Sequence, residues 1–306
     1  MEETDRDKIG SRLMTEPRTI LVTGATGRVG RHVVAGLREA AVTVRALVRN
    51  PLLAGLPSDV EIVTGDITDP DAVQKAAAGV DAAFLLWPSF SAEGAAPVVE
   101  ALAKQVSRVV YLSSMNVRDD QPPSASGVWG ELEHLVAKAG VDWTFLRPGG
   151  FAVNTQGWAE EFRTGHVIRM PFPGAARSLI HERDIAAVAV LALLDDKHIG
   201  QKYQLTGPES LTQEEQARII GDAVEKTVQI EEQSAAEARQ AMLEIGADPI
   251  LAESSVNYWS ALVDNPEPVT NTVEALTGRP ARTFREWAAD HADDFRILST
   301  TEVAQR

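Results

Sequence analysis

The chain of 306 residues contains no cysteine, which excludes disulfides, a cysteine nucleophile and cysteine-ligated metal sites. Basic residues are also scarce: 29 lysines and arginines stand against 44 aspartates and glutamates, a formal charge of −15. Since nucleic-acid binding depends on clustered positive charge, we expect no nucleic-acid partner. No apolar run approaches the roughly 18 residues of a membrane helix. We therefore expect no membrane segment and a cytoplasmic protein.

Two further classes of feature are missing. The six histidines show no paired spacing such as HExxH, so we predict no metal site. Residues 1–17 are polar and mixed in charge, and they lack the apolar run of a signal peptide. We expect them to be a disordered leader or a tag. The rest of the chain, in a protein that is 44% hydrophobic, has ample apolar content for a core.

A glycine-rich turn follows the first predicted strand, 19–23, and precedes a predicted helix, 28–40. Gly24 suits the tight turn, Gly27 lets the backbone approach a phosphate, and Gly30 lets the helix pack against the sheet. The helix start adds free N–H groups and a positive dipole end. An accidental turn is the alternative to a nucleotide site. The predicted cofactor contacts in this turn are Gly24, Thr26, Gly27, Arg28, Val29 and Gly30.

The second predicted strand, 42–48, is followed by Arg49, at the position that faces the adenosine ribose. An NAD site places aspartate or glutamate there to bind the 2′-hydroxyl, whereas arginine suits a 2′-phosphate. Arg49 therefore predicts NADP as the cofactor, with Arg28 as a second positive charge. The alternative is that both arginines are solvated surface residues.

Further cofactor contacts are predicted where later strands end. Asp66 follows the predicted strand 60–64, and in a doubly wound sheet such positions face the ligand crevice. Its carboxylate can bind the adenine amino group, or it can cap the local turn instead. The other residues predicted to contact the cofactor at strand ends are Ile67, Leu86, Trp87, Pro148, Gly149 and Phe151.

Strands and helices alternate regularly from residue 19 to about 150, which predicts an α/β fold with a doubly wound parallel sheet of the Rossmann type. We assign residues 18–150 to an NADP-binding domain and 151–298 to a smaller, mostly helical substrate lobe that also packs segments on the Rossmann domain. The predicted later elements of the first domain are helices 70–78, 94–105 and 128–139 and strands 82–86, 108–112 and 143–146.

Fewer elements are predicted in the second half. A strongly apolar helix, 185–194, opens behind Asp184, and a short strand covers 203–206. Capping boxes at Thr212 and Thr283 each predict a helix start. The last helix is expected to place Trp287 and Phe295 toward the protein, and the tail from residue 299 is expected to fray.

These motifs together resemble the short-chain dehydrogenase/reductase superfamily, and within it the atypical NmrA-like branch. The resemblance covers roughly residues 18 to 297 and implies an NAD(P)H-dependent oxidoreductase with a Rossmann fold. The segments that carry it are GATGRVG at 24–30, VRNP at 48–51, GD at 65–66, YLSS at 111–114, WTFLRPGGF at 143–151, IHERDIAAVA at 180–189 and LTGPESLT at 205–212.

The chain departs from the superfamily at its proton relay. Standard members place a tyrosine and a lysine four residues apart on the helix after the YLSS strand. Here those positions hold Trp129 and Glu133. An indole N–H is a poor acid, and a carboxylate raises rather than lowers the pKa of a neighbouring acid. The usual relay is therefore absent.

The remaining candidates for chemistry are Ser113 and His181. Ser113 ends the fifth strand, where its hydroxyl can bind a substrate carbonyl, or cap the loop instead. His181 can orient or protonate a substrate oxygen, or serve as a structural hydrogen-bonding group. Aromatic side chains can wall a flat substrate pocket or simply pack in the core. The residues predicted to bind substrate are Trp129, Trp158 and Phe172.

The missing tyrosine is tolerable if the substrate's own phenol stabilises the developing alkoxide. In this respect the chain resembles the angucyclinone ketoreductases of the simocyclinone pathway. The sequence thus predicts NADPH-dependent reduction of an aromatic ketone or quinone, a polyketide in antibiotic biosynthesis, by a monomer or homodimer. Two alternatives remain: a non-catalytic NADP sensor that binds a protein partner, and a quinone or dye reductase.

Overall fold

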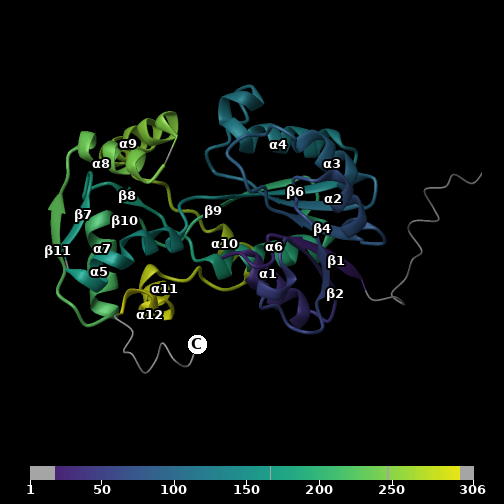
Figure 1. Cartoon of the computed structure of the whole chain (residues 1–306), viewed down its shortest axis with the longest axis horizontal. Helices are drawn as coiled ribbons and strands as arrows, with labels where there is room; N and C mark the ends of the chain where they lie inside the picture. The colour runs from purple at the N-terminus through teal and green to yellow at the C-terminus, as the bar shows by residue number, and fades with distance from the viewer. Residues whose placement is uncertain (1–17, 166, 247, 297–306) are drawn as a thin grey trace, which may run out of the picture. The chain divides into compact units, whose positions relative to one another are not determined.

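A computed structural model describes residues 18–165, 167–246 and 248–296, and the chain divides into two compact units (Figure 1). Among the described residues, unit 1 comprises 18–113, 117–145 and 189–201, and unit 2 comprises 114–116, 146–188 and 202–296. The predicted leader 1–17 and the tail from 299 lie outside the described residues. In the described chain, no helix combines the length and apolar character that a membrane crossing needs.

A seven-stranded parallel sheet confirms the predicted fold class, and its first five strands in chain order lie within unit 1. Its strand order is β3-β2-β1-β4-β5-β6-β9. The order reverses between β1 and β4, and in such sheets a ligand binds at this point, beyond the carboxyl ends of the strands. The strands are β1 (Thr19–Thr23), β2 (Thr43–Val48), β3 (Glu61–Thr64), β4 (Ala82–Leu85), β5 (Arg108–Leu112), β6 (Asp142–Pro148) and β9 (Gln201–Leu205).

Both faces of this sheet are covered, which explains the continuous apolar runs in its central strands. On one face, Leu21, Ala83 and Tyr111 share a buried cluster with α2 (Pro70–Ala77), α3 (Ala95–Ala103) and α4 (Gly127–Lys138). The other face packs against α1 (Gly30–Glu39) (Figure 1). Short 3-10 turns η1 (Pro51–Leu53), η2 (Pro123–Ser126) and η4 (Asp196–His198) complete the unit.

Unit 2 is built around a core of large aromatic side chains, with Phe162, Phe284, Trp287 and Phe295 fully buried. It contains two small sheets, in which β8 (Ala176–Arg177) pairs with β10 (Leu211–Thr212) and β7 (Val167–Met170) pairs with β11 (Gln229–Glu232). Its helical elements are η3 (Ala152–Trp158), α5 (Ala159–Thr164), α6 (Glu182–Leu194, continuing into unit 1), α7 (Gln213–Ala223), α8 (Ala235–Glu244), α9 (Pro249–Asp264), α10 (Thr272–Thr277), α11 (Phe284–Asp290) and α12 (Ala292–Phe295).

The predicted capping boxes at Thr212 and Thr283 are confirmed, and a third at Ser234 starts α8. Several helix ends differ from the predicted ones. The first helix begins at Gly30, because 24–29 form the turn itself, and α6 begins at Glu182 with two acidic residues in its first turn. The last helix breaks at His291, where φ is −111° and ψ is 12°.

Candidate cofactor and substrate site

The glycine-rich turn has the geometry expected of a phosphate-binding loop. Gly24 adopts φ +61°, a left-handed conformation that favours glycine, and its carbonyl accepts a 2.9 Å hydrogen bond from Gly27 N. A methyl group at Gly30 would overlap the Gly24 carbonyl oxygen. The Thr23 hydroxyl accepts a 2.8 Å bond from Leu86 N and so ties the turn to the end of β4. Backbone conformation therefore favours glycine at Gly24, and local packing requires it at Gly30.

The turn also fits a negatively charged group. Within the described chain, the first turn of α1 carries neither a capping side chain nor an acidic residue, so its positive dipole end is uncompensated. Thr26 and Arg28 are exposed beside it, while Val29 is buried. Arg31, which the sequence analysis did not identify, donates to the carbonyls of Gly27 and Thr26 at 3.2 and 3.3 Å. These features fit a cofactor pyrophosphate.

Arg49 and Asp66 lie at the ends of neighbouring strands. Arg49 is exposed directly after β2. Asp66, after β3, accepts bonds of 2.9 and 2.8 Å from the backbone and hydroxyl of Thr68. These bonds, together with the charge of Arg49, hold the pKa of Asp66 below its usual value. Asp66 thus caps its turn, and its predicted contact with adenine stays a prediction. Ile67 is half-buried against the unit 1 core.

Aromatic side chains gather where β4 ends. The Trp87 indole donates a 2.8 Å bond to Ser91 O, which fixes the loop after β4. In that loop Phe90 is 71% exposed and meets the Trp129 ring edge-to-face, with ring centroids 6.0 Å apart. Such pairs stabilise the packing of the two rings, and the exposed Phe90 ring remains accessible at the loop. Phe90 was not predicted as a site residue.

The end of β5 carries a buried polar pair. The Ser113 hydroxyl donates a 2.5 Å hydrogen bond to Glu133 Oε1 on α4. Ser113 is 4% exposed and Glu133 is 5% exposed. Burial and the Glu133 charge together raise the pKa of the neighbouring Tyr111 hydroxyl well above its ordinary value. The position that holds the relay lysine in standard members of the superfamily thus carries a carboxylate, that of Glu133, which binds the Ser113 hydroxyl.

In unit 2 the segment after β6 contains Pro148, Gly149 and Phe151. Gly149 N donates to Leu205 O at 2.9 Å, and Phe151 pairs with Ile180 in an isolated parallel bridge. A side chain at Gly149 would meet Met115 Sδ and Glu267 Oε2. The backbone of this segment is therefore closely packed from several sides.

Glu267 is a buried hub in unit 2. Its carboxylate accepts bonds from Arg177 Nε at 3.1 Å, Ser178 N at 3.1 Å and the Tyr258 hydroxyl at 2.5 Å. Burial favours the neutral form, but the Arg177 charge and these bonds outweigh it and lower the pKa of Glu267. Gly150 N, in the segment after β6, lies 3.5 Å from the same carboxylate.

His181 belongs to a second buried cluster in unit 2 and is only 1% exposed. Its Nδ1 lies 3.2 Å from the donor Arg183 N, and its Nε2 lies 3.4 Å from Asp290 Oδ2. Glu182 beside it accepts a 3.1 Å bond from the Trp287 indole and lies 2.7 Å from His291 Nε2. Both ring nitrogens of His181 thus have partners within unit 2, which fits the structural alternative.

This cluster predicts a pH-dependent stability. Burial alone lowers the pKa of His291, but its bonds to Glu182 and Asp294 outweigh it and raise the pKa above 6.5. Burial raises the pKa of Glu182, yet bonds from His181 and His291 bring it below 4.5. The His291 contribution is present below pH 6.5 and is lost as the pH rises through the raised pKa; the Glu182 contribution is lost as the pH falls below 4.5.

We therefore expect the free energy of unfolding to be higher at about pH 5.5 than at about pH 8.5, by on the order of 1 kcal/mol from this cluster. Urea unfolding at both pH values measures it. His291→Gln should remove this difference, whereas His134→Gln, at an exposed position on α4, should keep it. An unchanged difference in His291→Gln would contradict the assignment.

The other predicted aromatic residues also lie in unit 2. Trp158 is half-buried against the aromatic core. Phe172 adopts φ +52°, and its carbonyl accepts a 2.9 Å bond from Ala175 N. A left-handed conformation is costly for a bulky residue. Their contact with a substrate stays a prediction, as does that of Trp129 in unit 1.

Comparison with known proteins identifies the family. A family model described as NAD(P)H-binding matches residues 24–196. The chain belongs to the NAD(P)H-binding family. An NAD(P)H azoreductase of Xenophilus azovorans is 34% identical over 282 residues, which cover 90% of this chain and 99% of the relative. The enzyme interpretation is therefore confirmed over that of a regulator: the chain is an NAD(P)H-dependent oxidoreductase.

Other members of the NAD(P)H-binding family are similar over almost the whole chain. A (4-alkanoyl-5-oxo-2,5-dihydrofuran-3-yl)methyl phosphate reductase of Streptomyces griseus is 37% identical over 279 residues, with 90% of this chain and 99% of the relative covered. The NADPH-dependent quinone oxidoreductase QOR2 of Escherichia coli superposes with a TM-score of 0.73 at 24% identity, covering 89% of this chain and 98% of that structure. That likeness shows the shared fold.

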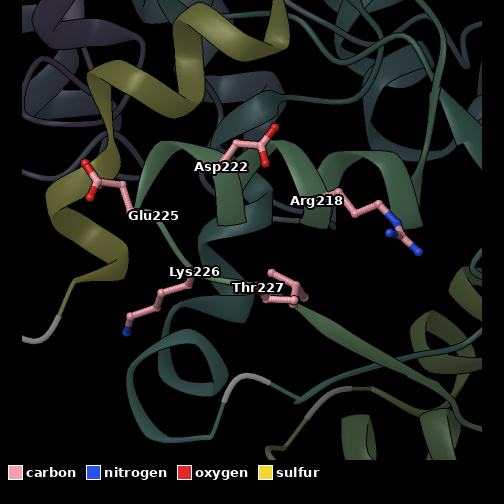
Figure 2. Close-up of a pocket in the computed structure, with 6 residues that line it drawn as sticks. Arg218, Asp222, Glu225, Lys226 and Thr227 are labelled. Atoms are coloured by element: carbon pink, nitrogen blue, oxygen red, sulfur yellow. The ribbon is translucent and has the colours of Figure 1, made fainter.

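Unit 2 of this NAD(P)H-binding protein also has a pocket of about 550 Å³ at the end of α7, lined by Arg218, Asp222, Glu225, Lys226, Thr227 and Val228 (Figure 2). Its two basic side chains have protein partners. Arg218 pairs with Glu214 at 2.5 Å, and Lys226 Nζ donates to Phe162 O at 3.0 Å. In Figure 2 the two basic side chains point in different directions, so they do not converge on a ligand. Among the described residues, no three metal-ligating side chains gather to hold an ion.

Proposed function

We propose that this oxidoreductase uses NADPH to reduce a conjugated carbonyl on an aromatic substrate, of the quinone type. The carbonyl of a polycyclic aromatic polyketide, in antibiotic biosynthesis, is one case of this class. The observation that carries the proposal is the hydrogen bond from Ser113 to Glu133. In this bond the Ser113 hydroxyl donates its proton to Glu133, whereas a simple ketoreductase would use such a proton to bind the substrate carbonyl.

The chemistry of the acceptor explains why this matters. Hydride addition to an isolated ketone produces a strongly basic alkoxide, which needs a positioned acid. Hydride transfer to a quinone, at a carbonyl oxygen or by conjugate addition to a ring carbon, produces a phenolate or an enolate, in which the conjugated ring delocalises the charge. Such an acceptor does not require a tyrosine and lysine pair. Trp129 at the tyrosine position then offers ring area instead of a proton.

The chain's own residues supply binding and orientation. Within unit 1, the turn 24–30 would hold the pyrophosphate, and Arg49 and Arg28 would hold the 2′-phosphate. The nicotinamide supplies the hydride when it is bound. Leu86 seals the turn from the side of β4, because its Cδ1 lies only 3.3 Å from where a Gly24 methyl group would sit.

The names of the two relatives above 30% identity support a conjugated acceptor. One is an azoreductase and the other reduces a dihydrofuranone phosphate. Both names describe a reducible group within a conjugated system. This favours the quinone-type acceptor over an isolated ketone for the present chain.

Steady-state oxidation of NADPH tests the proposal, with menadione as the quinone, methyl red as the azo compound and 4-phenylbutan-2-one, whose carbonyl is not conjugated with its ring, as the isolated ketone. We expect the rate enhancement over the uncatalysed reaction to be at least about 100-fold larger for menadione than for 4-phenylbutan-2-one, on the scale of one general acid. Equal enhancement of both would contradict the proposal. If the protein reduced none of the three compounds, the proposed quinone-type substrate class would be excluded.

Alanine substitution of Ser113 and of His181 tests the absence of a protein acid. A positioned acid contributes about 10²–10⁴-fold, whereas one orienting hydrogen bond contributes about tenfold. We expect each single variant to lose no more than about tenfold in single-turnover reduction of menadione, with an unchanged pH profile. A loss beyond about a thousandfold in either variant, with the fold intact, would identify a catalytic acid.

A further inference from the structure

Glu133 is a buried acidic residue whose effect on substrate choice the proposed function leaves open. It lies on α4 four residues after Trp129, so both side chains project from the same side of the helix. Trp129 contacts Phe90 at the exposed loop after β4. Within unit 1, an aromatic surface therefore lies next to the Ser113–Glu133 hydrogen bond.

The hydrogen bond restricts what Ser113 can do. A serine hydroxyl has one proton to donate and two lone pairs that accept. The distance of 2.5 Å to Glu133 Oε1 is that of a strong, charge-assisted O–H to carboxylate bond. Because the single proton is committed to Glu133, the hydroxyl is left as an acceptor. A substrate atom that meets Ser113 must then be a donor.

We propose that Glu133 is a positioning residue for specificity: it holds Ser113 as a hydrogen-bond acceptor, so the site selects aromatic substrates that carry a hydroxyl or N–H next to the reducible carbonyl. This inference rests on the proposed function and narrows its substrate class. It assigns Ser113 contact with a phenolic O–H rather than with the carbonyl oxygen. It also assigns Phe90 and Trp129 contact with the aromatic ring of the substrate.

A matched pair of quinones tests the inference. Juglone carries a phenolic hydroxyl beside its carbonyl, and juglone methyl ether keeps the ring and the oxygen but loses the donor. The measured quantity is the ratio of kcat/KM for juglone to that for its ether. Comparing this ratio between protein variants cancels the intrinsic reactivities of the two quinones.

We expect the ratio to be about tenfold higher in the unmodified protein than in Ser113→Ala, the effect of one hydrogen bond. In Glu133→Gln the amide can donate to Ser113 and release the serine proton, so the ratio should fall at least as far as in Ser113→Ala. Activity with the ether should survive or rise in this variant. The control Glu131→Gln, on the same helix, should keep the original ratio.

Three results would overturn the inference: a ratio unchanged in Glu133→Gln, a ratio unchanged in Ser113→Ala, or a fall of the same size in Glu131→Gln. If Glu133→Gln does not fold, Ser113→Ala alone decides. If the unmodified protein reduces neither quinone, the proposed function fails. Tryptophan-fluorescence titration with the two quinones then still tests the donor preference, and equal affinities would overturn it separately.

Discussion

Replacing Arg49 by aspartate is expected to weaken NADPH binding by about 100-fold and to make NADH the better cofactor. Arg49 is exposed directly after β2, in the position predicted to face the adenosine ribose. Charge-assisted bonds from a guanidinium to a phosphate contribute about 1.5–3 kcal/mol, and an aspartate would instead repel the 2′-phosphate while accepting a bond from a 2′-hydroxyl.

Dissociation constants for both cofactors, measured by calorimetry with the unmodified protein and the variant, check this result. Arg38→Asp is the matched control, because this substitution changes the charge by the same amount. Arg38 lies on α1 and pairs with Asp59 at 2.8 Å. It should leave the preference for NADPH in place. Equal affinity of the unmodified protein for NADPH and NADH would refute the role of Arg49.

Removal of the Glu267 carboxylate is expected to cause the largest loss of stability. Glu267→Ala leaves Arg177 and the Tyr258 hydroxyl without their shared acceptor in a buried place. Breaking one side of a buried ion pair costs about 3–5 kcal/mol. At about 2–4 °C per kcal/mol for a unit of this size, Tm should fall by at least about 6 °C.

Thermal unfolding measures this loss of stability. Two further variants serve as a partial loss and as a control. Tyr258→Phe removes one hydrogen bond to Glu267 and should cost about 1–2 kcal/mol. Glu232→Ala, at an exposed position on β11, should change stability by less than about 0.5 kcal/mol. A Glu267→Ala variant as stable as Glu232→Ala would show that the hub contributes nothing.

The regular half of the fold could be predicted because its signals are local. Alternating strands and helices gave the sheet, Gly24 and Gly30 gave the turn, and the capping boxes gave two helix starts. In each case the residues that decide the structure lie within a few positions of one another. The NAD(P)H-binding assignment followed from the same segments.

The less regular half depends on contacts that no local pattern reveals. Helix α8 buries only Ala238, so it has no apolar stripe from which to predict it. The break at His291 accompanies bonds to Glu182, which is 109 residues away. The Glu267 hub likewise joins residues 90 positions apart.

The candidate site was predictable in its residue types but not in its pairings. Ser113 and Glu133 were both singled out from the sequence, yet the bond between them depends on how α4 packs on β5. The sequence analysis proposed His181 as an acid because the sequence around a histidine does not show which residues surround it in the folded chain. Asp290 and Arg183 supply those neighbours in the folded chain. The catalytic and binding roles of these residues stay predictions.

The division of the chain has a consequence for its synthesis. The chain passes from one unit to the other after residues 113, 116, 145, 188 and 201, so neither unit is a single uninterrupted piece. During translation, unit 1 cannot be completed until residue 201 has left the ribosome, although its glycine-rich turn emerges near the beginning. For the same reason, a fragment that ends at residue 150 would lack the end of α6 and the turn η4, which lie within 189–201, and with them the whole of β9, the neighbour of β6 in the sheet. Its exposed sheet edge would then be open to pairing with other nascent chains.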